Sequence, residues 1–582
     1  MLKNNNNGGI MQAFVRRKDL MDLYKSFDKI HDPSVYDIGP NDSEWVEVDT
    51  FQMNFSEQEA TLTANSEALP KPPQQLKWRS PTLHNLDRLI LKNKIAQNQA
   101  LIRETIKATS SIIIPRTQAH NRKCAETTLE EEQEKRADII AEQIKAWRSL
   151  LPSVLRKFSK IKDYRHQKKI KHKVTTLLMF GLFSFIFRLG SCREMNRELT
   201  SPVIFDNLKK IFPELETIPH ADTLARLLKK MNPLEIEKAN IQLIKDLIKK
   251  KKFKKLLIDG RLPITIDGTQ KLFRDGLLND GRWCERSVGK GDDKQQYIYI
   301  IEANITFKNG LTIPLMTEYL CRSNNQLDGS LDKQDNELTA FERLAERLKR
   351  YFPRLKIILL ADSMYATQNV MDICKNNVWD FLITLPKDKL KELAKVLKEK
   401  EDTRQSIPEQ THYRERKQKF SWENNIIYGD SLNLIIHLVD CFESYDVVNT
   451  KTGEIEKKHS NHAWISSIAF SLNNIHELCN LGARKKELIE DSINTEKNRG
   501  YKYKHLFSHN WNAMKGFHYL MRLGHAINAL SEFTKKLKKI IKGLGCSATL
   551  KLIKETLFNP WLSSKWYEEQ LLVVPQLRLQ SG

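Results

Sequence analysis

The chain has 582 residues, which is enough for two to four domains with well-developed hydrophobic cores. Lys and Arg number 95 against 72 Asp and Glu, so the formal net charge is +23. This excess favours polyanionic partners such as nucleic acid, although a composition rich in Lys, Ile and Asn explains part of it. The eight cysteines lack Cys-x-x-Cys or Cys/His spacing, which argues against a zinc site and for a reducing compartment.

The amino terminus gives no sign of export, and no segment has the length of a membrane span. Asn4 to Asn7 are polar, unlike the start of a signal peptide. The longest mostly apolar run, residues 174–187, is too short to cross a bilayer and predicts a buried core helix. We therefore expect a soluble, cytoplasmic protein with no membrane partner.

The first 255 residues divide into three predicted segments. Residues 1–80 have weak periodicity and predict a loosely ordered segment. In residues 81–150, apolar side chains recur at helical spacing, which predicts a helical arm that binds DNA or a partner, or else a plain solvated bundle. Residues 151–255 predict a helical, DNA-binding domain that ends in the lysine-rich run 249–255. That run is either a solvated helix end or a phosphate contact.

From residue 256 onward, β-branched and apolar runs replace the helical pattern. Strands are predicted at 262–266, 297–307, 311–319, 356–361 and 379–385, with helices at 336–351 and 366–377. Asn309-Gly310 between the second and third strands is a hairpin turn. Three strands followed by helix, strand, helix and strand is the order of an RNase H-like core, in which the first and fourth strands lie side by side.

The remaining chain interrupts and then completes this α/β core. A β-rich insertion is predicted at about 400–470, followed by a helix over 471–496. The catalytic domain would therefore span residues 256–505, and a helical C-terminal region would span 506–582.

Three acidic residues occupy positions where this fold would bring them together. Asp267 ends the first predicted strand, Asp362 ends the fourth, and Glu490 lies on the helix after the insertion. Carboxylate oxygens suit Mg²⁺, with Mn²⁺ as a substitute, and two such ions can activate the attacking oxygen and stabilise the leaving one. Each residue also has an ordinary alternative: a strand-end aspartate, a helix cap and a solvated acid, respectively.

The spacing of these acids resembles that of the DDE transposases of bacterial insertion sequences. The resemblance is to the group with a β insertion and a Tyr-Arg-Glu-Lys signature around the third acid. Lys486, Glu490 and Lys497 stand at the last three signature positions, with Lys486 replacing arginine and Ala483 standing where tyrosine is expected. The resemblance covers roughly residues 163–530 and leaves out the first 150.

The resemblance also implies roles for individual residues. Asp267 would bridge two metal ions, Asp362 would bind one of them, and Glu490 the other. Lys486 and Lys497 would hold backbone phosphates, and Trp464 would be a platform for a flipped base. Two solvated lysines and a buried tryptophan are the ordinary alternatives.

The resulting functional hypothesis is a DNA transposase that cleaves the ends of an insertion sequence and transfers the 3′-hydroxyl. Its partners would be double-stranded DNA, in the form of terminal inverted repeats and target DNA, and a second copy of the chain in a paired-end complex. It would act in the bacterial cytoplasm, at the nucleoid. The alternatives are an RNase H-like nuclease without strand transfer and a catalytically inactive, domesticated DNA-binding protein.

Overall fold

The computed structural model forms two compact units. It describes residues 2–7, 10–16, 45–48, 112–113, 126, 128–275, 282–287, 294–321, 335–385, 405–406, 410–414, 416–427, 434–448 and 454–580. The smaller unit comprises Met1–Gln118, Gln410–Gln418 and Glu443–Ser460, and the larger one comprises Ala119–Glu409, Lys419–Phe442 and Asn461–Gly582. Most of the helical arm predicted at 81–150 lies outside the described residues, except for its last part.

The smaller unit contains a short antiparallel sheet near the amino terminus. Strands β1 (Leu2–Asn7), β2 (Ile10–Arg16) and β3 (Trp45–Val48) pair in that order. Within residues 1–80, which the sequence predicts to be loosely ordered, these three strands are the described part. The sequence does not predict these strands, because its periodicity is weak and the first strand is rich in asparagine.

The helical part of the larger unit is organised around one apolar helix, α5 (Val174–Ile186), as the sequence predicts. Every residue of α5 except Thr175 is buried. A Cβ on Gly524 of α14 (Trp511–Glu532) would lie 2.8 Å from the Phe185 Cβ, so this glycine lets α14 pack closely against α5. The surrounding helices are α4 (Leu129–Phe158), α6 (Cys192–Leu199), α7 (Pro202–Ile211), α8 (Ala221–Lys230) and α9 (Leu234–Lys249).

The sheet of the larger unit has the predicted strands in the predicted order. Its core strands are β5 (Leu262–Asp275), β7 (Lys294–Thr306), β8 (Thr312–Tyr319), β9 (Ile357–Ala361) and β10 (Asp380–Thr384). They pair in the order β8-β7-β5-β9-β10, and β6 (Cys284–Ser287) pairs with β7. The first and fourth strands, β5 and β9, are parallel neighbours, as expected. The hairpin turn is also confirmed, because Gly310 has a φ of +89° and joins two antiparallel strands.

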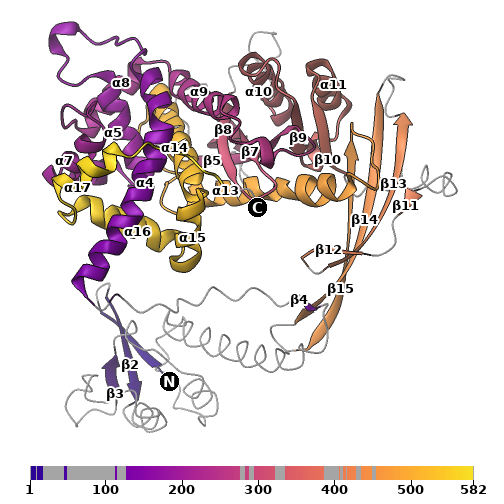
Figure 1. Ribbon diagram of the computed structural model, residues 1–582. Coiled ribbons are helices and arrows are strands. Elements are labelled where there is room, and N and C mark those ends of the chain that lie inside the picture. The colour runs from indigo at the N-terminus through magenta and orange to yellow at the C-terminus, as the bar shows by residue number, and fades with distance from the viewer. Residues whose placement is uncertain are drawn as a thin grey trace. The chain divides into compact units, whose positions relative to one another are not determined.

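Both faces of β9 and β10 are covered, which explains why β9 is apolar at every position and β10 at its three central positions. Leu359 and Phe381 belong to the main core, which includes residues of α10 (Glu337–Tyr351) and α11 (Gln368–Asn377). Leu360 and Leu382 belong to a second cluster, which contains Leu478 and its neighbours before α13 (Glu487–Asn498). In Figure 1, α10 and α11 lie on one side of this sheet and α13 on the other.

The strands of the β-rich insertion pair onto the edge of the core sheet at β10. Strand β15 (Ile455–Ser466) pairs antiparallel with β10, and the order continues through β14 (Ile435–Val448) and β13 (Arg416–Ile427). Short strands β11 (Gln405–Ser406), β12 (Gln410–Tyr413) and β4 (Ile112–Ile113) pair with β13 or β14. Polar residues as well as apolar ones make up these strands, as in the first half of β15.

The C-terminal region is helical, as predicted. After α14 come α15 (Lys535–Leu544), α16 (Cys546–Phe558) and α17 (Ser564–Leu572). None of the helices in the described part of the chain is both long and apolar enough to cross a membrane.

Candidate carboxylate site

Strands β5 and β9 place two aspartates on the same face of the sheet. Their parallel pairing covers Leu262–Thr265 of β5, with Thr265 opposite Leu360. Asp267 lies two positions beyond Thr265, and Asp362 lies two positions beyond Leu360. Alternate residues of a strand share a face, so both aspartates lie on the same face as Leu360, which is the α13 side. The prediction that Asp267 ends its strand is wrong, because β5 continues to Asp275 along β7. The parallel pairing nevertheless ends before Asp267.

The third carboxylate comes from α13, which begins later than the sequence predicts. Instead of a continuous helix over 471–496, residues Glu477–Gly482 form a wide π-helical segment and Ala483–Lys486 a tight 3₁₀ turn. The α-helix then starts at Glu487, and Glu490 lies in its first turn. Mid-helix changes of winding of this kind are common at functional sites. Here the change brings Lys486 and Glu490, four residues apart, to the same carboxylate cluster.

The three predicted acids meet in space although they are far apart along the chain. One carboxylate oxygen from each of Asp267, Asp362 and Glu490 can be chosen so that all three lie within 4.8 Å of one another. Their side chains are 23%, 46% and 59% exposed, so the cluster opens to solvent on one side. Three converging oxygen donors with access to solvent fit a hard divalent cation.

Lys486 contacts all three carboxylates. Its ammonium donates to Asp362 Oδ2 and, at 2.8 Å, to Glu490 Oε1, and it lies 3.5 Å from Asp267 Oδ1. The side chain is only 6% exposed. Although burial opposes it, hydrogen bonding to Asp362 and Glu490 raises the pKa of Lys486, so the ammonium stays charged. In this conformation Lys486 is not available for the DNA contact that the sequence suggested.

Asp267 is the most buried member of the cluster, and this burial raises its pKa. Burial raises the pKa of Asp267 to about 6; Lys486 opposes this shift, and Glu490 and Asp362 reinforce it. A carboxylate that is costly to ionise among like charges gains from a nearby cation. This is the electrostatic pattern of a functional site.

A fourth acid, Glu337, lies behind the cluster and was not recognised in the sequence as part of it. Its carboxylate accepts hydrogen bonds from the hydroxyls of Tyr299, at 2.5 Å, and Tyr365, at 3.3 Å. A Cβ on Gly268 would come within 2.6 Å of Glu337 Oε1, so a larger residue would force the Glu337 carboxylate to shift. Glu337 therefore contacts three parts of the site: Tyr299 on β7, Gly268 next to Asp267, and Tyr365 in the turn that follows Asp362. Gly268 inside a strand is the sequence signal for such a close approach.

Lys497 and Trp464 have intramolecular partners. Lys497 donates to Thr269 Oγ1 at 2.5 Å, two positions along β5 from Asp267, so it flanks the carboxylate cluster. Trp464 is 4% exposed, belongs to the second apolar cluster and stacks on the His462 ring at 5.7 Å. Its ring is buried in this conformation, and DNA contacts by either residue remain predictions.

Helix α13 is held in place by a buried ionic network on the same face of the sheet. Arg522 of α14 bonds Glu496 at 3.1 and 3.3 Å and approaches Glu302 at 3.1 Å, and both acids are fully buried. Glu302 pairs directly across from Asp267 on the neighbouring strand. His525 adds a contact of 2.7 Å to Glu496. Burial would raise the pKa of Glu496, but Arg522 and then His525 lower it to about 2.

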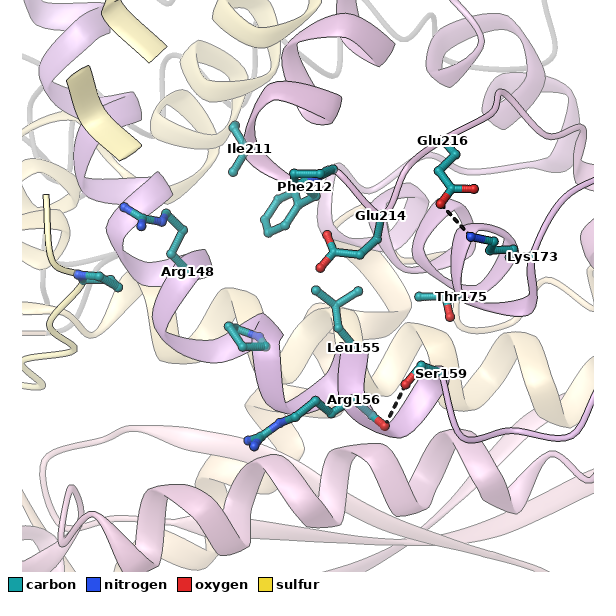
Figure 2. A pocket seen from close by; sticks show the side chains of 13 residues that line it. Arg148, Leu155, Arg156, Ser159, Lys173, Thr175, Ile211, Phe212, Glu214 and Glu216 are labelled. Carbon is teal, nitrogen blue, oxygen red and sulfur yellow. Dashed lines mark hydrogen bonds and ion pairs between the residues drawn. The ribbon is translucent and has the colours of Figure 1, made fainter. Parts of the chain in front are cut away.

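A separate concavity in the helical part is the main alternative site (Figure 2). It has a volume of about 820 Å³ and lies between α4, the start of α5 and the end of α7. Three of its charged groups are engaged within the protein: Lys173 pairs with Glu216 at 2.7 Å, and Arg148 donates to two backbone carbonyls of the C-terminal segment. They do not converge on a common point, unlike the three acids around Lys486.

Comparison with known protein families relates one part of the chain to transposases. Residues 155–244, which hold α5 to most of α9, match the family described as DDE_Tnp_1-associated. No curated protein matches the chain. The family match indicates a transposase-related protein of the DDE type, and it lies before the sheet that carries the three acids.

Proposed function

We propose that this protein is a DDE transposase that cuts DNA strands with divalent metal ions and joins the resulting 3′-hydroxyl to a target phosphodiester. The observation that carries the proposal is the convergence of Asp267, Asp362 and Glu490 within 4.8 Å. The transposase-associated match in the preceding helical segment is independent support, because it involves none of these residues.

The strand order β8-β7-β5-β9-β10 supports an RNase H-like core. In that arrangement two acids leave adjacent parallel strands at the same end, and a helix adds a third. The strand pairing β5-β9 and the position of α13 meet both requirements. The β-rich insertion before α13 fits the group with the Tyr-Arg-Glu-Lys signature.

Asp267, Asp362 and Glu490 would hold Mg²⁺ or Mn²⁺, which when bound supplies Lewis-acid activation of the attacking and leaving oxygens. The protein's own contribution is to fix the carboxylates. Glu337 fixes the surroundings of Asp267 and Asp362, and the Arg522–Glu496 pair fixes the helix that carries Glu490. Lys497, beside Thr269, would hold a DNA phosphate next to the cluster.

The test is cleavage of a DNA duplex that carries the terminal inverted repeat of the element surrounding the gene. We expect nicking with Mg²⁺ or Mn²⁺ and no detectable nicking by Asp267→Asn or Glu490→Gln, while both variants still bind the duplex. A matched control is Asp491→Asn, since Asp491 is an exposed acid next to Glu490 on the same helix. Cleavage that survives either substitution in the cluster would refute the proposal.

Hydrolysis without strand transfer would favour the second candidate, an RNase H-like nuclease. The same carboxylate cluster supports both reactions, so the assay must include a target duplex and score joined products. DNA binding without any cleavage would favour the third candidate, a domesticated DNA-binding protein.

A further inference from the structure

Lys486 lies where a metal ion would have to bind. Its Nζ is 2.8 Å from Glu490 Oε1 and 3.5 Å from Asp267 Oδ1, and it also donates to Asp362. Oxygen ligands of Mg²⁺ lie about 2.0–2.1 Å from the ion. An ion that shares oxygens of these three carboxylates would thus be centred close to the position of the ammonium, and both cations cannot fit there.

We infer that Lys486 is an intramolecular cation that holds the carboxylate cluster together, and that a divalent ion binds only by displacing it. The inference rests on the proposed function, since it takes the cluster to be the metal site. It gives Lys486 two mutually exclusive positions: inside the cluster, or released from it.

The local charge supports this exchange. Three carboxylates within 4.8 Å repel one another, and at 6% exposure the Lys486 ammonium is the cation that contacts all three. A divalent ion carries twice the charge of the ammonium and would take over this neutralisation. Two cations forced into the same few ångströms would repel each other strongly, so the lysine must leave.

The position of Lys486 in the chain permits this movement. It ends the 3₁₀ turn Ala483–Lys486 and precedes α13, so its ammonium reaches the cluster on a flexible four-carbon side chain. The carboxylates of Asp362 and Glu490 are about half exposed, which leaves an open side through which the ammonium can withdraw. The backbone of α13 need not move, because Glu496 remains bonded to Arg522.

The experiment measures the chemical accessibility of Lys486 with and without metal. The full-length protein is pulsed with an amine-acylating reagent in the presence or absence of Mn²⁺, and modified lysines are quantified by peptide mass spectrometry. We expect Mn²⁺ to raise the acylation of Lys486 several-fold. Lys271 is the internal control, because it is 3% exposed and donates to the Tyr503 carbonyl at 2.7 Å, so its protection should not change. Lys173, 68% exposed, controls for reagent activity.

A second measurement compares the Mn²⁺ affinity of two variants by calorimetry. Lys486→Met should bind Mn²⁺ at least tenfold more tightly than the wild type, because the competing cation is gone. Lys497→Met, which removes the same charge from the Thr269 contact, should change the affinity much less.

The outcomes separate the inference from the proposed function. If Mn²⁺ binds and Lys486 stays protected from acylation, the inference is wrong, while the proposed metal site stands. If neither the wild type nor Lys486→Met binds Mn²⁺, the proposed metal site itself is wrong. Equal exposure of Lys271 and Lys486 on adding Mn²⁺ would indicate general loosening and would also overturn the inference.

Discussion

Replacing Arg522 by methionine is expected to destabilise the larger unit severely. The guanidinium is 3% exposed and contacts two carboxylates with no exposed side-chain surface, those of Glu302 and Glu496. It also donates to the Ala303 carbonyl at 3.3 Å and to Asn304 Oδ1 at 2.5 Å. Methionine can fill much of the space but cannot compensate the charges. Removing one partner of a buried ionic network costs about 3–5 kcal/mol, so we expect a loss of that size in the free energy of unfolding.

Urea denaturation followed by tryptophan fluorescence measures this loss. The matched control is Arg156→Met, because Arg156 is 74% exposed and lies 3.5 Å from Asp246, so its loss should cost less than about 1 kcal/mol. Adding Glu496→Gln to Arg522→Met should recover part of the stability, since one uncompensated carboxylate is then removed. A loss for Arg522→Met no larger than that for Arg156→Met would refute the argument that this network holds α13 in place.

Three further changes test the surroundings of the site. Gly268→Ala should lower the free energy of unfolding by about 1–3 kcal/mol, because the new Cβ would press against the Glu337 carboxylate. In a thermal melt, the double variant Gly268→Ala/Glu337→Ala should be more stable than Gly268→Ala alone. No recovery in the double variant would contradict the close approach of the two residues. Burial, reinforced by Lys271, lowers the pKa of His518 to about 4, below an unfolded value of about 6.5. The stability from its neutral form is therefore complete above pH 6.5 and is lost as pH falls toward 4, by up to about 3 kcal/mol; His518→Gln should flatten this part of the stability profile, and an unchanged slope would count against the assignment. Lys497→Ala should weaken DNA binding about equally for all sequences and reduce the salt slope by about 1, and an unchanged slope would show that Lys497 holds no phosphate.

The sequence was informative where local chemistry dominates. Strand β9 is apolar at each position because both its faces are buried, and this continuity is visible as a run of residues ending in Asp362. Asn309 and Gly310 specify a turn by their backbone preferences alone. The acids at 267, 362 and 490 could be chosen because Asp362 follows such a strand, Asp267 follows the buried run at the start of β5, and Glu490 has the spacing of a known signature. Their convergence could then be expected from the strand order.

The sequence was less informative where distant residues decide. The sequence predicts a boundary at residue 150 between a helical arm and the following domain, yet α4 continues across it to Phe158, since Val154, Leu155 and Phe158 are buried in the core. Glu337 lies in the first turn of its helix, and its partners Tyr299 and Tyr365 are 38 and 28 residues away, so the local sequence gives no sign of these contacts.

Lys486 is the clearest case of such a long-range effect. Its spacing from Glu490 predicts a shared helical face, and the two do meet. The additional contacts to Asp267 and Asp362, more than 120 residues away, turn a predicted surface lysine into a buried one. Trp464 is likewise buried, because it packs in the second apolar cluster with residues distant in sequence such as Leu382.

The most direct test of the account is a calorimetric titration of Mn²⁺ into the wild-type protein and into Asp267→Asn. We predict saturable binding to the wild type at the carboxylate cluster and an affinity at least tenfold weaker in the variant, which loses the charge of the most buried acid. Equal affinity in the two proteins would contradict the claim that Asp267, Asp362 and Glu490 form a metal site.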